Sequence, residues 1–242
     1  MSDDNLRVAL VTGAGRGIGR AIAPALAADG CSVVLTARTA DEIDSAAAQI
    51  EDAGGSALAI AGDLTDEKFV EELFATVRER FGRLDILVNN AGMAPFGSVT
   101  ELPVDQFRAA LELNVVAVFH CTQHGVRIMK ENGDRGKIIN IGSVRSHWTE
   151  GGDGGAYNAS KYALRGMTET IARELHGSGS KIAVGMVCPG VVDTSLTNPD
   201  GETREGWLEP EDIARAVLHA ANAPDGVNVF DTVVFRTEQK PW

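Results

Sequence analysis

The sequence predicts an α/β fold in which helices cover both faces of a parallel sheet, a doubly wound arrangement. Short runs rich in valine, isoleucine and leucine alternate along the chain with longer segments of helical periodicity. The short runs are almost continuously apolar, which is typical of strands that are buried on both faces. A chain of 242 residues is long enough for one such domain and leaves little for a second. We therefore expect a single domain over residues 1–242.

Seven apolar runs are candidate strands, and six segments between them are candidate helices. The strands are expected at Val8–Val11, Ser32–Ala37, Ala57–Ala61, Ile86–Asn89, Lys137–Ile141, Lys181–Val187 and Val229–Phe235. The helices are expected at Gly17–Ala28, Asp41–Ala53, Glu67–Phe81, Val104–Lys130, Tyr157–His176 and Glu211–Asn222. Thr39 to Glu42 has the residue types of a capping box, and Pro210 lies at a first-turn position. The loop of about residues 193–209 follows the sixth strand, where such a sheet places a substrate lid.

The first strand leads directly into a glycine-rich turn that opens the first helix. Such a turn brings unpaired backbone N–H groups and the positive end of a helix to one point, which suits a diphosphate. Glycine also permits positive φ angles and lets the phosphates approach closely. The spacing is G-x-x-x-G-x-G rather than G-x-G-x-x-G. The predicted dinucleotide-binding residues of this turn are Gly13, Arg16, Gly17, Ile18 and Gly19.

The end of the second strand indicates which dinucleotide binds. A protein that reads NAD carries a carboxylate there, roughly twenty residues beyond the glycine turn, for the ribose 2′-OH. This chain has Arg38 instead, together with Arg16 in the turn. Two guanidinium groups suit a 2′-phosphate, whereas the plainer interpretation is two solvated surface arginines. We assign the nearby Asp41 and Glu42 to helix capping, and expect NADP(H) to be preferred with NAD(H) as the alternative.

Polar residues also follow the third and fourth strands. Asp63, beside Leu64, suits the adenine amine, although capping of the next helix explains it equally well. Asn90, Ala91 and Gly92 suit a bend over the cofactor ribose, although the same residues are typical of an ordinary turn. Because the carboxyl ends of parallel strands share one edge, we expect these residues in a single ligand site.

Four residues are candidates for proton chemistry. Tyr157 and Lys161 are four apart and so share one face of a helix. An ammonium beside a phenol lowers the phenol pKa from its ordinary value near 10, which makes the phenol a usable acid and base. Ser143 ends the fifth strand at the same edge and can donate to a carbonyl oxygen. Asn114 is a polar residue among apolar neighbours in a helix, and a bound water is one reason for it.

The combination of these motifs resembles the short-chain dehydrogenase/reductase family in its single-domain form. The matching residues are Thr12-Gly13-x-x-x-Gly17-Ile18-Gly19, Asn89-Asn90-Ala91-Gly92, Asn114, Ser143, Tyr157-x-x-x-Lys161, and Pro189-Gly190 followed by Thr194. They occur in the family's order over nearly the whole chain. The resemblance implies a Rossmann-like sheet of seven strands, and a homotetramer or homodimer with the long helices from Val104 and Tyr157 at the interface.

The resemblance also implies residue roles. Tyr157 would be the acid and base, Ser143 would polarise the substrate oxygen, and Asn114 would hold a relay water. Lys161 would hold the cofactor ribose and lower the Tyr157 pKa. The residues expected beside the nicotinamide are Pro189, Gly190, Val192 and Thr194. The implied reaction interconverts a carbonyl, in a ketone or aldehyde, with an alcohol by hydride transfer from NADP(H).

Two alternatives stay open: a non-catalytic NADP(H)-binding sensor or scaffold, and an NAD-dependent alcohol, sugar or polyol dehydrogenase. Arg145, His147 and Trp148 follow Ser143 and are candidates for the substrate cleft or for a solvent-facing loop. Arg145 would bind a carboxylate or another polar acceptor group of the substrate. His120 and His124 share a helix face, but no third ligand has a suitable spacing, so we expect no metal.

The composition of the chain limits which partners and which cellular compartment we expect. The net charge is −12 and the isoelectric point is near 4.8, which argues against nucleic acid and anionic membranes as partners. The sequence shows no apolar run long enough to span a membrane and no signal-peptide pattern. Its three cysteines are odd in number and widely spaced, as in proteins of a reducing compartment. We therefore expect a cytoplasmic protein that acts on a small molecule.

Overall fold

The computed structural model describes residues 7–149, 152–198, 200–201 and 205–238, so the two ends of the predicted domain and part of the predicted lid lie outside the described residues. Seven parallel strands form one sheet in the order β3-β2-β1-β4-β5-β6-β7. The strands are β1 (Arg7–Thr12), β2 (Cys31–Ala37), β3 (Ser56–Ala61), β4 (Ile86–Asn89), β5 (Arg135–Ile141), β6 (Lys181–Pro189) and β7 (Asp231–Val234). This confirms the predicted doubly wound α/β fold.

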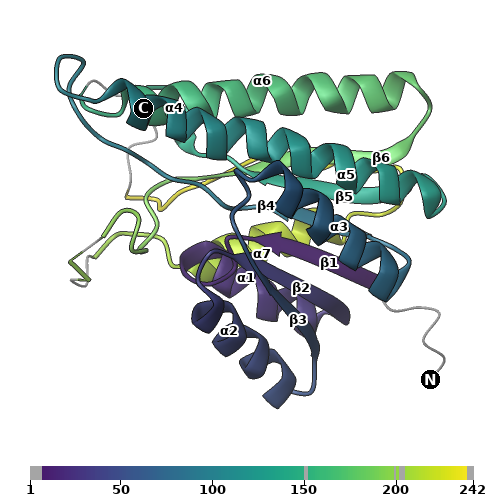
Figure 1. Cartoon of the computed structure of the whole chain (residues 1–242). Helices are drawn as coiled ribbons and strands as arrows, with labels where there is room; N and C mark the ends of the chain where they lie inside the picture. Colours follow the sequence, from purple (N-terminus) through teal and green to yellow (C-terminus); the bar gives the residue numbers. More distant parts are fainter. Residues whose placement is uncertain (1–6, 150–151, 199, 202–204, 239–242) are drawn as a thin grey trace.

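Helices cover both faces of the sheet (Figure 1). One layer contains α1 (Gly17–Ala28), α2 (Ala40–Asp52) and α7 (Pro210–Ala221). The other contains α3 (Glu67–Phe81), α4 (Val104–Leu111), α5 (Ala117–Glu131) and α6 (Gly155–Gly177). No helix in the described part of the chain is long and apolar enough to cross a membrane.

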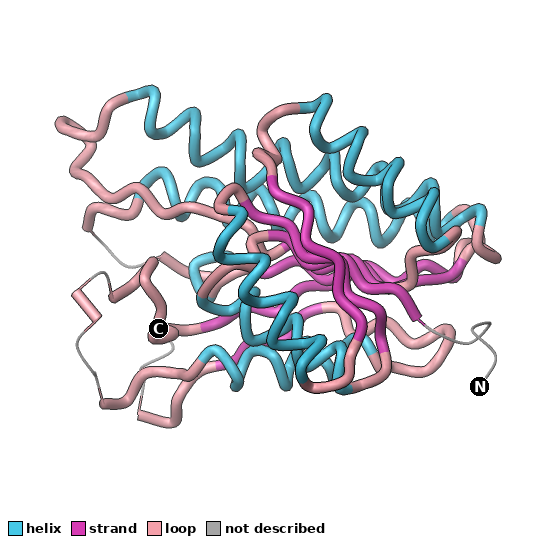
Figure 2. The backbone as a smooth tube through the Cα atoms, turned by 60° about the horizontal axis from the view of Figure 1, so that its bottom comes forward, coloured by secondary structure: helices cyan, strands magenta, loops and turns pink. Residues whose placement is uncertain are grey.

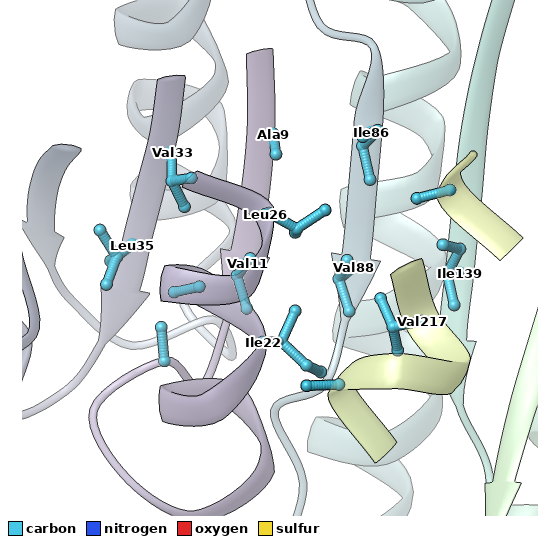
Figure 3. Packing of buried hydrophobic residues seen from close by; sticks show 14 of the residues in the cluster. Ala9, Val11, Ile22, Leu26, Val33, Leu35, Ile86, Val88, Ile139 and Val217 are labelled. Atoms are coloured by element: carbon cyan, nitrogen blue, oxygen red, sulfur yellow. The ribbon is translucent and has the colours of Figure 1, made fainter. Parts of the chain in front are cut away.

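Strand alternation divides the core into two apolar layers. Val11 of β1 faces the α1 side of the sheet, whereas Leu10 faces the α3 side. Figure 3 shows Ile22 and Leu26 of α1 packed against β1 and its neighbours, with Val217 of α7 beside them. These side chains have no measurable exposure. The central strands are therefore apolar on both faces, which explains their near-continuous hydrophobic sequences.

All the carboxyl ends of the strands meet at one edge of the sheet. The strand order changes direction at β1, which pairs with β2 on one side and β4 on the other. In such a sheet, ligands bind outside the carboxyl ends at this switch point. The longest loops also lie together on one side of the molecule (Figure 2). The fold thus places the glycine turn, Ser143 and the loop after β6 around one edge.

The predicted helix Val104–Lys130 is interrupted. The residues from Glu112 to Val116 form a π-helical turn between α4 and α5, and Asn114 lies at its centre. A π turn accommodates one extra residue without ending a helix, and it often marks a functional site. Here the buried Asn114 side chain is held by Met93, outside the helix, so the interruption depends on a tertiary contact.

The two predicted helix starts had different outcomes. Pro210 lies at the first helical position of α7, as predicted, and Glu209 and Asp212 complete a capping box there. The expected capping box at Thr39 is wrong, because the Thr39 side chain makes no capping hydrogen bond. The Glu42 carboxylate is turned toward the glycine turn instead, where a Cβ on Gly15 would lie 2.7 Å from its oxygen. This carboxylate belongs to the ligand site.

Candidate active site

A cavity of about 760 Å³ opens along the carboxyl edge of the sheet. It runs from the glycine turn, past the ends of β2, β3 and β4, to the start of α6. The predicted site residues that line it are Gly13, Arg16, Gly17, Ile18, Arg38, Asp63, Leu64, Asn90, Ala91, Gly92, Ser143, Tyr157, Lys161, Pro189, Gly190, Val192 and Thr194. One continuous cavity therefore joins the predicted dinucleotide residues to three of the four predicted catalytic residues.

The glycines of the turn are required for different physical reasons. Gly13 and Gly17 have φ angles of +64° and +54°, in the left-handed region that favours glycine. A Cβ on Gly13 would lie 2.8 Å from the Ala91 Cα. Gly19 does not line the cavity, because it packs beneath the turn, where a Cβ would overlap the Gly13 carbonyl oxygen. The turn is thus shaped by close backbone contacts.

Thr12 and Asn90 join the glycine turn to the loop after β4. The Thr12 hydroxyl accepts hydrogen bonds from the backbone N–H groups of Asn90 and Ala91. The Asn90 side-chain amide donates to the carbonyl oxygens of Thr12 and Gly13, at 2.8 and 3.1 Å. Asn90 lines the cavity as predicted, but its amide group is engaged by the protein. Its observed contacts preorganise the turn.

Charges of both signs surround the end of the cavity near β2 and β3. Arg16 and Arg38 line it, and so does Glu42. Asp63 accepts hydrogen bonds from the backbone and hydroxyl of Thr65, and these contacts, together with the charge of Arg38, lower the Asp63 pKa. Asp63 does not cap α3, because Asp66 does so.

Ser143 and Lys161 are each fixed by a hydrogen bond at the reactive end of the cavity. Ser143 follows β5 and is 6% exposed, and its Oγ accepts a hydrogen bond from the Arg145 backbone N–H. The hydroxyl proton is thereby left to donate elsewhere. The Lys161 Nζ donates to the Ile141 carbonyl at 2.8 Å and lies 5.6 Å from the centroid of the Tyr157 ring. Burial lowers the pKa of Lys161 to about 8.

The pKa of Tyr157 differs from expectation. Burial of the phenol raises its pKa, and this outweighs a hydrogen bond with Ser143 and the charge of Arg145, both of which lower it. The expected lowering by Lys161 is therefore not seen. The reason is that Lys161 points to a carbonyl and its own charged form is disfavoured by the same burial.

Asn114 uses its side chain to hold the loop after β4. Its Oδ1 accepts from the Met93 N–H at 2.9 Å, and its Nδ2 donates to the Met93 carbonyl and the Ser160 hydroxyl. Ser160 in turn donates to the Tyr157 carbonyl. Asn114 is not among the described residues that line the cavity, although the neighbouring Leu113 is. Its contacts connect the loop after β4 to the helix that carries Tyr157.

The three predicted substrate residues are not among the described residues that line the cavity. His147 lies 3.3 Å from the Asp231 carboxylate and 5.6 Å, between ring centroids, from Trp148. The apolar lining comes from other residues, including Met93 and Leu196. Glu42 and Asp231 were missed as candidates. Asp231 has no local signal in the sequence, because its partners come from other strands and loops.

His120 and His124 approach each other on α5, with 3.1 Å between their Nε2 atoms. Phe74 stacks on His124 with 5.4 Å between ring centroids. Among the described residues, no third histidine, cysteine or carboxylate joins this pair in a candidate metal cluster. Both histidines are half-buried on α5.

The sequence of this chain is similar to those of known proteins. The family model described as short chain dehydrogenase matches residues 7–205. The chain belongs to this family. An uncharacterised oxidoreductase of Staphylococcus aureus is 35% identical over 228 residues, which cover 94% of this chain and 96% of the relative. Dehydrogenase/reductase SDR family member 11 of Bos taurus is 35% identical over 247 residues, which cover 96% and 97%. These relatives support an oxidoreductase enzyme.

Solved short-chain dehydrogenase structures share the fold over almost the full length. An alcohol dehydrogenase from the archaeon Thermococcus sibiricus, complexed with 5-hydroxy-NADP, has a TM-score of 0.89 at 30% identity and covers 98% of this chain and 100% of its own. A metagenomic short-chain oxidoreductase in complex with NADP has a TM-score of 0.83 at 33% identity and covers 96% and 98%. This chain is therefore an oxidoreductase of the short-chain dehydrogenase family.

Proposed function

We propose that the protein interconverts a ketone or aldehyde and an alcohol, using NADP(H) and Tyr157 as the acid and base. The observation that carries this proposal is the continuity of one cavity between Arg38 and the group formed by Ser143, Tyr157 and Lys161. The lining, from Arg38 past the glycine turn to Tyr157, suits an extended dinucleotide whose reactive ring ends beside the phenol. The NADP bound to related structures supports the same cofactor here.

The residues present fit a dinucleotide. Glycine keeps the turn open at Gly13, and a Cβ on Gly17 would lie 3.2 Å from Thr194 on the opposite wall. The first turn of α1 presents unpaired N–H groups to a diphosphate. The residues proposed for the adenosine half are Arg16, Arg38, Asp63 and Leu64, and those for the nicotinamide half are Asn90, Ala91, Gly92, Pro189, Gly190, Val192 and Thr194.

When bound, the cofactor supplies or accepts the hydride. The Ser143 hydroxyl, whose oxygen accepts from the Arg145 N–H, donates its proton to the substrate oxygen. Tyr157 delivers the proton to the same oxygen in reduction and removes it in oxidation. Its raised pKa keeps the phenol protonated, which favours its role as the acid in reduction. Lys161 holds the cofactor ribose from its buried position at the base of the cavity.

Asn114 acts as a positioning residue with a relay water in this proposal. Its hydrogen bonds hold Met93 on one side and Ser160 on the other. One lone pair of its Oδ1 is left for water. The described part of the loop at residues 193–209 is proposed as the substrate lid, because Thr194 and Leu196 line the cavity. The Val192–Leu208 bridge anchors the base of this lid.

The decisive experiment compares the wild type with Tyr157→Phe. We expect the variant to lose at least about 10²-fold in turnover of ketones with NADPH, because the proton donor is removed. NADPH binding, measured by fluorescence titration, is expected to stay close to that of the wild type. More than a few per cent residual turnover contradicts the assigned role of Tyr157. Normal cofactor binding with no turnover by the wild type over a broad panel of ketones and alcohols would favour the sensor instead.

The assembly and compartment are part of the same proposal. Apolar side chains on the α4–α5–α6 layer are unusually exposed, including Phe107 at 37%, Phe119 at 44% and Tyr162 at 41%. Exposed patches of this kind mark protein interfaces. We propose a homotetramer or homodimer that covers this layer, which light scattering can test. The described cysteines are all free and buried, which supports a cytoplasmic location.

A further inference from the structure

Three metal-ligating side chains meet behind Ser143, outside the dinucleotide cavity. Cys188 lies near the end of β6, Asp231 begins β7, and His147 follows the short helical turn after Ser143. One ligand atom from each lies within 4.8 Å of the other two. These residues are 41 and 43 positions apart in the sequence, so the adjacency of β6 and β7 creates the cluster.

The measured distances resemble the edges of a tetrahedral zinc site. With bonds of about 2.0 Å to nitrogen or oxygen and about 2.3 Å to sulfur, a tetrahedral ion separates N and O by about 3.3 Å and S and O by about 3.5 Å. His147 Nε2 lies 3.3 Å from Asp231 Oδ1. Cys188 Sγ lies 3.6 Å from the same oxygen. Only the distance between the Cys188 sulfur and the His147 ring nitrogen, which is at most 4.8 Å, has to change when the ion binds.

A second observation points to a ligand at this position. Within the described residues, the buried His147 Nε2 makes no hydrogen bond and has only the Asp231 carboxylate, 3.3 Å away, as a charged neighbour. A buried polar atom that makes no hydrogen bond is costly. The other carboxylate oxygen, Oδ2, lies 3.9 Å from the Arg165 guanidinium. Oδ1 can therefore bind an ion while Oδ2 keeps its contact, which is how outer partners orient metal-binding carboxylates.

We propose that His147, Cys188 and Asp231 bind a divalent transition-metal ion of the zinc type. Thiolate, imidazole and carboxylate together suit zinc, and a fourth position stays available for water. On binding, the metal–sulfur bond replaces the S–H bond of Cys188, and the thiol proton passes to solvent. No electron is transferred. The proposal does not depend on the catalytic activity or on NADP(H).

Local electrostatics is compatible with the ion. Burial and the negative charge of Asp231 raise the pKa of Cys188 to about 12. A divalent cation between the two residues offsets the charge of Asp231 and stabilises the buried thiolate. The cations facing the cluster are Arg165, which contacts Asp231, and Lys161, which interacts electrostatically with Cys188. The ion together with the thiolate and carboxylate has no net charge. Binding therefore adds little repulsion with the two cations.

The test titrates Co²⁺ into tag-free, full-length protein and records the absorption spectrum. We expect one equivalent to bind and to give a thiolate-to-cobalt charge-transfer band, which reports a sulfur ligand independently of activity. Cys188→Ala is expected to lose this band. His147→Gln is expected to bind at least about tenfold more weakly, since loss of even an outer partner costs about 10–100-fold. Zn²⁺ should displace Co²⁺ and raise the melting temperature of the wild type.

The matched control is His124→Gln, which breaks the competing His120–His124 pair on α5. Its charge-transfer band and affinity should equal those of the wild type. Absence of the band from the wild type overturns the proposal, as does loss of binding in His124→Gln rather than in His147→Gln. If circular dichroism shows that Cys188→Ala does not fold, His147→Gln decides the question alone. The His147 side chain is partly exposed, and the His147→Gln variant keeps the sulfur ligand of Cys188.

Discussion

The two ends of the cavity are held by different kinds of contact. At the dinucleotide end, Thr12 and Asn90 join adjacent strands through hydrogen bonds to backbone groups. At the reactive end, Ser143 and Lys161 also bond to backbone groups, but the segment that follows Ser143 depends on side chains from distant strands, such as the His147 contact with Asp231. Backbone contacts leave little choice of residue, whereas side-chain contacts vary with the neighbours. The dinucleotide end therefore suits a cofactor that many reactions share, and the reactive end suits a particular substrate.

The two ends of the cavity also differ in what shifts the pKa values of their ionisable groups. Lys161 and Tyr157 have pKa values that are shifted mainly by burial, so their behaviour depends on packing. Asp63, near Arg38, is more exposed, and its pKa is lowered mainly by the backbone hydrogen bond from Thr65, with a smaller contribution from the charge of Arg38. A change at the reactive end should therefore alter pH dependence. A change at the dinucleotide end should alter cofactor affinity.

The largest expected effect comes from Gly19→Ala. The new Cβ would overlap the Gly13 carbonyl and the Asn90 amide, which are fixed by the hydrogen bonds of the turn. Overpacking of this kind costs about 1–3 kcal/mol, or a fall of roughly 2–12 °C in melting temperature for a chain of this size. NADPH binding by titration should be lost. The control is Gly166→Ala on α6, where a Cβ meets nothing within 4 Å. If both variants bind NADPH normally, the turn is not held as rigidly as described.

The next effect is the pH dependence of stability due to Lys161. Its folded pKa of about 8 lies below the ordinary value of 10.5, so the folded state binds fewer protons than the unfolded state between these pH values. The contribution of Lys161 to stability should therefore rise with pH in this window, by at most about 3 kcal/mol, against the opposite contributions of Cys121 and Cys188, whose raised pKa values lower stability as the pH rises above 9. Lys161→Met should remove this rise, whereas Lys68→Met on the exposed surface of α3 should keep it. Urea unfolding from pH 7 to 10.5 measures the difference, and parallel curves for all three proteins would refute the burial argument.

The sequence predicted the fold, and most of the residues that it proposed for the dinucleotide line one cavity. Apolar periodicity is a local property, so the strands and helices were placed close to their observed bounds. The glycine turn is also local, because its φ angles are set within a few residues. Parallel strands then bring Ser143, Tyr157 and the turn to one edge without further information.

The reactive end was predicted less completely because its geometry depends on tertiary contacts. The π turn at Asn114 depends on Met93, and no pattern around Asn114 reveals it. At the dinucleotide end, Glu42 was missed for the same reason, because its position follows from the approach of α2 to the glycine turn. The pKa of Tyr157 was expected to fall, yet burial raises it. Residue types near a site are thus easier to predict than burial and charge balance.

A smaller effect concerns the choice of cofactor. Arg38 attracts a 2′-phosphate, whereas Glu42 repels it and is able to accept from a ribose hydroxyl. Arg38→Gln should lower the ratio of kcat/KM for NADPH to that for NADH by about tenfold, which corresponds to 1.4 kcal/mol. Glu42→Gln should raise the same ratio by several-fold. Steady-state kinetics with both cofactors test this pair of opposite changes. A fall in the ratio for both variants would mean that Glu42 acts by positioning α2.

The smallest expected effect is at Leu196, a residue of the proposed lid that lines the cavity and is 46% exposed. Burying about half of a leucine against a bound substrate contributes roughly 1 kcal/mol. Leu196→Ala should therefore raise the KM for apolar ketones about fivefold and leave NADPH affinity unchanged. The control is Leu218→Ala on α7. Leu218 packs against the core beneath α1 and α7, so this variant should lower stability without a selective change in KM. Equal KM values for Leu196→Ala and the wild type would place the substrate away from the lid, and so deeper, near Met93.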